Sequence, residues 1–164
     1  MTFVRGPYAD WLEWLTAFER GEDRPAGHLL PVDEALGPDM AGRLLVRVSA
    51  AYSARAARWS ETLDRRIGTS QGLADLAATL VTARSGLRPL WTLADSALLP
   101  EAMRQDMRRA LTDMVSTTQQ TLEDGARRRT GGAELLAVLK QHRLNTPVPI
   151  AQPARPPSGR TVIL

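Results

Sequence analysis

Arginine side chains are the most abundant groups in this sequence that could bind a ligand. The 164 residues include twenty arginines and a single lysine, Lys140. Four of the arginines share one side of the helix predicted over residues 38–67, opposite its apolar face: Arg43, Arg47, Arg58 and Arg65. A stripe of guanidinium groups can bind phosphates. Glu61 lies in the same stripe, however, four residues before Arg65, in the order that favours a helical ion pair.

The distribution of charge favours a different use for this stripe. Residues 1–40 contain three arginines and eight carboxylates, a net charge of −5; the whole chain carries +3, so the remainder carries +8. The sequence lacks a helix-turn-helix pattern, aromatic residues interleaved with basic ones and a lysine-rich arm. We therefore expect a solvated face, part of which docks the acidic N-terminal segment. Nucleic-acid binding is the less favoured interpretation.

Patterns typical of catalysis or metal binding are missing from the sequence. There is no cysteine, and neither His28 nor His142 has a carboxylate at the Glu-x-x-His spacing of metal sites in helical bundles. Gly131-Gly132 lacks the spaced glycines and the Lys-Ser/Thr pair of a phosphate loop, and is better explained as a helix-breaking turn. No serine lies in a Gly-x-Ser-x-Gly elbow. The sequence thus predicts no enzyme, no cofactor and no metal.

The N-terminal segment is the most aromatic part of the chain. Five of the eight aromatic residues fall within the first eighteen: Phe3, Tyr8, Trp11, Trp14 and Phe18. A helix over residues 8–20 would place its large apolar residues on one broad side. The centre of this side is formed by Tyr8, Trp11, Leu15 and Phe18, and Trp14 and Leu12 lie on its two shoulders. The polar side is acidic, which is unfavourable for a membrane surface. We expect this helix to pack on the rest of the protein, with Trp14 as a candidate partner-binding residue.

The apolar spacing beyond this segment predicts an all-α fold. Three helices of about 30 residues, over 38–67, 70–99 and 101–129, are joined by connections of one to three residues. Such short connections make consecutive helices antiparallel. A short helix over 133–143 follows. The expected architecture is an antiparallel bundle of three long helices plus two short helices, with an extended Pro-rich C-terminal tail.

Two of the long helices carry features with specific consequences. In the helix over 70–99, leucines and alanines repeat every seven residues through Pro89, so we expect the proline to kink this helix rather than end it. In the helix over 101–129, we expect one face to bury residues spaced by three and four positions: Met103, Met107, Ala110, Met114, Thr118 and Thr121. The methionines are favoured as core residues over an adaptable partner groove.

The last twenty residues differ abruptly in composition. Residues 145–164 contain five of the eleven prolines, which favours an extended, polyproline-like segment. Two groups in it are candidates for recognising a partner protein: Pro153, Arg155 and Pro156, and the apolar cluster Val162, Ile163 and Leu164. The alternative is a terminus without a partner, or a short strand that folds back on the bundle.

These observations define the expected organisation and function. We divide the chain into an N-terminal helix and loop over 1–37 that packs on the bundle, a helical bundle over 38–144, and a tail over 145–164. No secretory signal or apolar run of about 18 residues is present, so we expect a cytoplasmic protein. The favoured function is a non-enzymatic adaptor, scaffold or assembly component that contacts another protein or a second copy. The alternatives are a helical DNA-binding or regulatory protein, and a bundle that binds an anionic small molecule.

Overall fold

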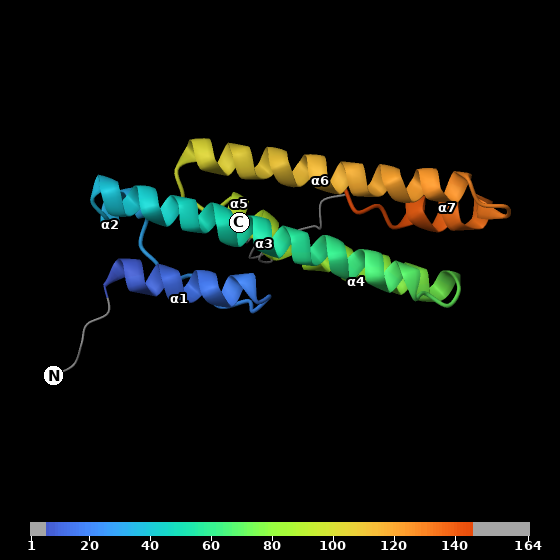
Figure 1. Ribbon diagram of the computed structural model, residues 1–164, viewed down its shortest axis with the longest axis horizontal. Coiled ribbons are helices and arrows are strands. Elements are labelled where there is room, and N and C mark those ends of the chain that lie inside the picture. Colours follow the sequence, from blue (N-terminus) through green and yellow to red (C-terminus); the bar gives the residue numbers. More distant parts are fainter. Residues whose placement is uncertain (1–5, 146–164) are drawn as a thin grey trace, which may run out of the picture.

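The computed structural model describes residues 6–145, and this part of the chain is helical without strands, which confirms the all-α prediction (Figure 1). The helices are α1 (Pro7–Glu19), α2 (Val32–Ala35), α3 (Pro38–Gly68), α4 (Leu73–Gly86), α5 (Arg88–Ala94), α6 (Glu101–Arg127) and α7 (Gly132–Gln141). The predicted tail residues Pro153, Arg155, Pro156, Val162, Ile163 and Leu164 lie outside the described residues.

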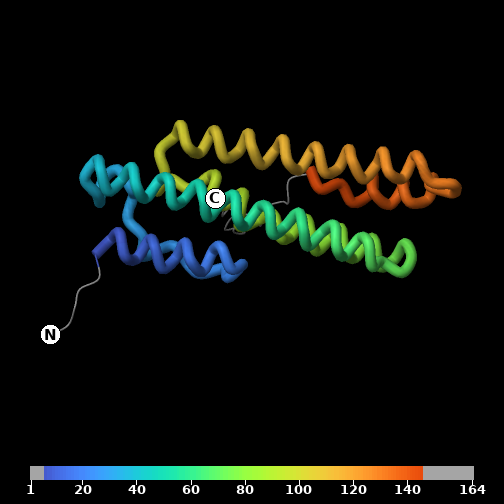
Figure 2. The backbone as a smooth tube through the Cα atoms, viewed as in Figure 1, coloured from blue at the N-terminus to red at the C-terminus, as the bar shows by residue number. Residues whose placement is uncertain are grey.

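The molecule is elongated, with α3 and α6 running along its length (Figures 1 and 2). The pair α4 and α5 returns antiparallel to α3, as the short connections predict. The two short predicted helices pack at opposite ends: α1 lies against the first half of α3, and α7 lies against the end of α6 and against α4. Each therefore completes a separate part of the core.

The predicted third long helix is shorter and is divided in two. Its halves, α4 and α5, meet at Leu87, and α5 ends at Ala94 rather than near residue 99. Pro89 explains the division, because proline has no backbone N–H and its ring clashes with the carbonyl four residues earlier. The turn that follows Ala94 closes with a hydrogen bond of 3.2 Å from the Leu99 N–H to the Ser96 carbonyl, immediately before Pro100.

Two aromatic side chains from α3 hold the divided helix in place. The Trp59 indole N–H donates to the carbonyl of Ala83 at 2.7 Å, in the last turn of α4. The Tyr52 hydroxyl donates to the carbonyl of Leu90 at 3.1 Å, in α5. Gly86 permits this packing, since a Cβ there would lie 3.3 Å from the Trp59 ring. Both halves of the divided helix are thereby fixed to one face of α3.

The buried face of α6 differs in phase from the predicted one. Its most buried residues follow one another at intervals of four, and then seven: Met107, Leu111, Val115, Gln119 and Ala126. Ala110 and Thr121, predicted on this face, are exposed, whereas Met103 and Met114 are partly buried against the core. The interpretation of the methionines as core residues is therefore confirmed.

Gln119 is the polar residue that fixes the end of the chain to α6. Its side-chain amide donates to the carbonyl of Leu139 at 3.2 Å, and its oxygen accepts from the N–H of Leu144 at 3.0 Å. Only 5% of Gln119 is exposed, and its donor and acceptor groups are paired. A buried amide with these partners stabilises α7 at one position along α6.

Two glycines at the same end of the molecule differ in the space available for a side chain. A Cβ on Gly132 would lie 1.8 Å from the Ala126 carbonyl oxygen, whereas a Cβ on Gly125 in α6 would meet nothing within 4 Å. We expect Gly132→Ala to lower the free energy of unfolding by about 1–3 kcal/mol. The matched variant Gly125→Ala should raise it by about 1 kcal/mol. Urea denaturation followed by circular dichroism checks both, and a neutral Gly132→Ala variant would contradict the close turn.

The buried hydroxyl of Tyr52 makes the stability sensitive to alkaline pH. Burial raises the pKa of Tyr52 well above its usual value of about 10, and the negative charge of Asp95 raises this pKa further. The stability that protonated Tyr52 contributes is complete below about pH 10, the usual pKa of tyrosine. It is lost progressively as the pH rises from there toward the raised pKa of the folded protein. We expect Tyr52→Phe to cost about 1 kcal/mol at pH 7 but to lose less stability between pH 9 and 11 than the wild type. Equal alkaline losses in urea denaturation would show that Tyr52 is not responsible.

Candidate functional site

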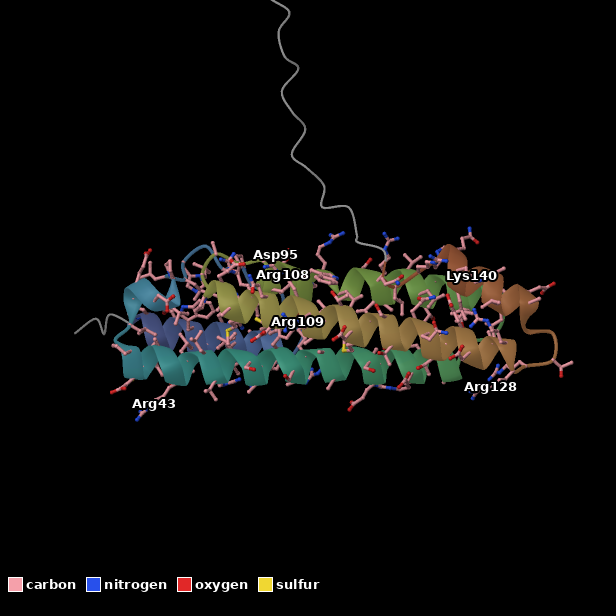
Figure 3. All side chains as sticks on the ribbon, turned by 90° about the horizontal axis from the view of Figure 1, so that it is seen from above. Arg43, Asp95, Arg108, Arg109, Arg128 and Lys140 are labelled. Atoms are coloured by element: carbon pink, nitrogen blue, oxygen red, sulfur yellow. The ribbon has the colours of Figure 1, made fainter. Side chains whose placement is uncertain are left out.

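The acidic N-terminal segment docks on the arginines of α3, as one of the sequence interpretations predicted. Arg47 forms two hydrogen bonds to Glu19, of 2.5 and 3.0 Å. Arg58 donates to the carbonyl of Arg20 at 2.9 Å. The other two arginines of the predicted stripe, Arg43 and Arg65, are exposed, and Arg43 points away from the molecule in Figure 3.

Arg55, which the sequence did not single out, is the most deeply buried arginine of this interface. It is 8% exposed, and its guanidinium donates to Asp23 at 2.7 Å and to the Phe18 carbonyl at 3.4 Å. The same group lies 4.6 Å from the centre of the Phe18 ring. One guanidinium thus contacts the end of α1 and the loop that follows, through an ion pair, a hydrogen bond and a cation–π contact.

Two tryptophans then fix the loop after α1 as it returns along the helix. The Trp11 indole donates to the carbonyl of Leu30 at 2.9 Å, and the Trp14 indole donates to the carbonyl of Arg24 at 3.0 Å. At the end of the loop, the N–H of Val32 donates to the carbonyl of Leu98 at 3.0 Å. The loop is therefore tied to α1 on one side and to the residues after α5 on the other.

These contacts enclose a largely apolar pocket of about 390 Å³ between α1, the loop and α5. Its apolar walls come from these three segments and from the turn after α5: Trp11, Trp14, Phe18, Leu29, Leu93 and Leu98. Trp14 stacks on Phe18, with ring centres 5.2 Å apart, and meets Trp11 edge-on at 6.0 Å. Charged residues of the loop line the same pocket, together with Arg88 from the first turn of α5. We call this hollow the aromatic pocket.

A second hollow of about 230 Å³ lies between α3 and α4. Trp59, Leu63 and Ala83 contribute apolar surface to it, and Arg58 and Arg66 contribute guanidinium groups. The turn after α1 supplies Gly21 to this hollow and the next two residues to the aromatic pocket. We call it the arginine hollow. A further hollow of about 510 Å³ lies at the other end of the molecule, where the α3–α4 and α6–α7 turns meet.

The remaining candidate groups line neither the aromatic pocket nor the arginine hollow. His28 lies exposed in the loop, and His142 follows α7 at its C-terminal end. Gly131 and Gly132 form the turn from α6 into α7, which fits the interpretation as a helix-breaking turn. Within residues 6–145, no three histidine, aspartate or glutamate side chains are grouped so that they could hold a metal ion. None of the helices in this range combines the length and the apolar character needed to cross a membrane.

Trp14 is the one predicted partner-binding residue within the described range, and it is half-buried in the wall of the aromatic pocket. The sequence signal for it was its place on the shoulder of the apolar face of α1. The signal for the opposite wall was weaker, since the residues after Pro89 were expected to continue the same helix beyond a kink. Whether Trp14 contacts a partner stays a prediction.

The N-terminal helix should contribute strongly to stability. Trp11 is completely buried and hydrogen-bonded, so we expect Trp11→Ala to lower the free energy of unfolding by about 3–5 kcal/mol. Val46 on α3 is 72% exposed, and Val46→Ala should change this energy by no more than about 0.5 kcal/mol. Urea denaturation of both variants checks the packing of α1. A loss below 1 kcal/mol in Trp11→Ala would contradict it.

Comparison with known proteins does not assign this site. No protein-family model, no curated protein and no solved structure matches the chain. The function is therefore inferred from the geometry of the two hollows.

Proposed function

We propose that this protein is a non-enzymatic cytoplasmic adaptor that binds a segment of a partner protein in the aromatic pocket. The observation that supports this proposal most directly is the pocket itself, an apolar hollow whose lining includes half-buried Trp14 and the buried Trp11 and Phe18. Interfaces between proteins concentrate their binding energy where a large side chain fills such a hollow. The volume of about 390 Å³ lies within the range of small binding pockets.

The walls of the pocket are organised before any partner arrives. The indole N–H groups of Trp11 and Trp14 are already paired with loop carbonyls, so an apolar side chain can enter without leaving a polar group unpaired. The stacking of Trp14 on Phe18 restricts both rings. Binding to walls that are already ordered costs less conformational entropy than binding to mobile side chains.

The contacts of the α3 arginines make the two alternative functions less favoured. Arg47 and Arg55, which a phosphate backbone would need, are occupied by Glu19 and Asp23. An anionic small molecule finds guanidinium groups in the arginine hollow, but most of the surface that lines this hollow is apolar. A protein segment that inserts an apolar side chain suits these apolar linings better.

Site-specific photocrosslinking in the native host tests the proposed function. A photoreactive amino acid at Thr92, an exposed residue lining the aromatic pocket, should label one dominant protein. The same amino acid at Thr112, which is exposed on α6 away from both hollows, is the matched control. Replacing Trp14 by alanine should reduce labelling from position 92, because the pocket loses a wall. Equal labelling from both positions, or unchanged labelling from position 92 in the Trp14→Ala variant, would contradict the proposal.

A separate experiment tests the tail as a second contact, since its residues Pro153, Arg155 and Pro156 were predicted to recognise a partner. A chain that ends at Asn145 should keep the helicity and the melting temperature of the full chain, because Leu144 and the preceding helices hold the core. We expect it to label less partner from position 92. Unfolding of the shortened chain, or unchanged labelling, would show that the tail is not a separate recognition segment.

A further inference from the structure

We infer that the partner segment is acidic: one apolar side chain enters the aromatic pocket, and flanking carboxylates pair with Arg88 and Arg66. This inference rests on the proposed function, because it names the chemistry of the same partner. It draws on three observations: the two hollows adjoin, the free charges beside them are positive, and the fold already binds an acidic aromatic segment on the same helix.

The aromatic pocket and the arginine hollow adjoin one another. Gly21 lines the arginine hollow, and Glu22 and Asp23 line the aromatic pocket. On the opposite side, Gly86 lines the arginine hollow and Arg88 lines the aromatic pocket, and these residues are only two positions apart in the chain. A single extended or helical segment of a partner can therefore contact both hollows.

The carboxylates beside the two hollows already have partners, and two of the guanidinium groups do not. Glu22 pairs with Arg24 at 3.0 Å, and Asp23 pairs with Arg55 at 2.7 Å. Arg66 and Arg88 are exposed, and neither guanidinium pairs with a carboxylate in the described part of the chain. The charges left for a partner are thus positive, and complementary charge favours an acidic segment.

The docking of α1 on α3 shows the same combination of contacts within the molecule. Leu15 and Phe18 of α1 are buried in the shared core, while Glu19 pairs with Arg47 of α3. An apolar anchor beside a carboxylate is therefore a form of segment that this arginine-bearing helix already binds.

A protein segment suits this surface better than a nucleic acid. The unpaired guanidinium groups beside the hollows, Arg66 and Arg88, lie on different helices and do not form the continuous basic track that a phosphate backbone needs. Binding of single-stranded nucleic acid also needs free aromatic faces for the bases. The Trp14 and Phe18 rings stack on each other, so one face of each is covered.

Three labelled peptides and one oligonucleotide test this inference with the full-length protein. The peptides are twelve residues long and share a central Leu-Trp-Leu, and their remaining positions alternate alanine with glutamate, glutamine or lysine. The oligonucleotide is a twenty-nucleotide single strand of mixed sequence. Fluorescence anisotropy at 50 and 300 mM NaCl gives the dissociation constants. At 50 mM NaCl we expect the glutamate peptide to bind about tenfold more tightly than the glutamine peptide, and this ratio to shrink at 300 mM.

Charge reversal at the two free arginines locates the effect. In the double variant Arg66→Glu and Arg88→Glu, the glutamate peptide should lose its advantage and the lysine peptide should gain affinity. The matched control reverses Arg43 and Arg128, two exposed arginines near opposite ends of the molecule (Figure 3), and should keep the preference for glutamate.

Four results would overturn the inference. These are equal binding of the glutamate and glutamine peptides, an equal loss in the control double variant, tighter binding of the oligonucleotide than of the glutamate peptide, and no binding of any peptide. The crosslinking at Thr92 separates these failures from a failure of the proposed function, because it detects a partner of any charge.

Discussion

The contact of the Arg55 guanidinium with α1 and its following loop is the interaction on which the candidate site depends. A guanidinium that is only 8% exposed must find partners, because burying an unpaired charge is costly. Its partners, Asp23 and Phe18, lie in the loop and in α1. The Asp23 side chain is 65% exposed, so the ion pair itself adds little stability, and the contact acts chiefly by fixing position. With this end of α1 fixed, the loop can return along the helix to the two indole N–H groups that hold it.

The opposite wall of the pocket depends on a defect in helix continuity. Pro89 prevents α4 from continuing, and α5 starts again beside the loop, where it supplies Arg88 and Leu93 to the pocket. The break does not loosen the fold, because Trp59 and Tyr52 of α3 donate hydrogen bonds to carbonyls on either side of it. The pocket therefore lies between α1, which is docked by charged contacts, and α5, which is redirected by Pro89. Both helices pack against α3.

Much of the fold could be predicted from the sequence, and the physical reason is periodicity. The spacing of apolar residues indicates which helices exist and which side each buries, as α1 shows with Trp11, Leu15 and Phe18. The spacing could not indicate which neighbour a helix meets. Arg55 looked like one polar residue among many, because its burial depends on α1 packing alongside that part of α3. Val115 and Gln119 of α6 were missed for a similar reason: a glutamine becomes a core residue only when the backbone of α7 supplies its partners. Trp14 was identified as a shoulder residue, but the pocket beside it depends on a loop whose path no periodicity describes.

Amide hydrogen exchange measured by mass spectrometry tests whether Arg55 positions the N-terminal wall of the site. The comparison is between the wild type, Arg55→Ala and the control Arg43→Ala, whose side chain is exposed. If Arg55 fixes this wall, exchange in α1 and in residues 22–31 should accelerate at least about tenfold in Arg55→Ala, with α6 and α7 unchanged and the control like the wild type. Unchanged exchange in α1, or uniform acceleration over the whole molecule, would contradict the account.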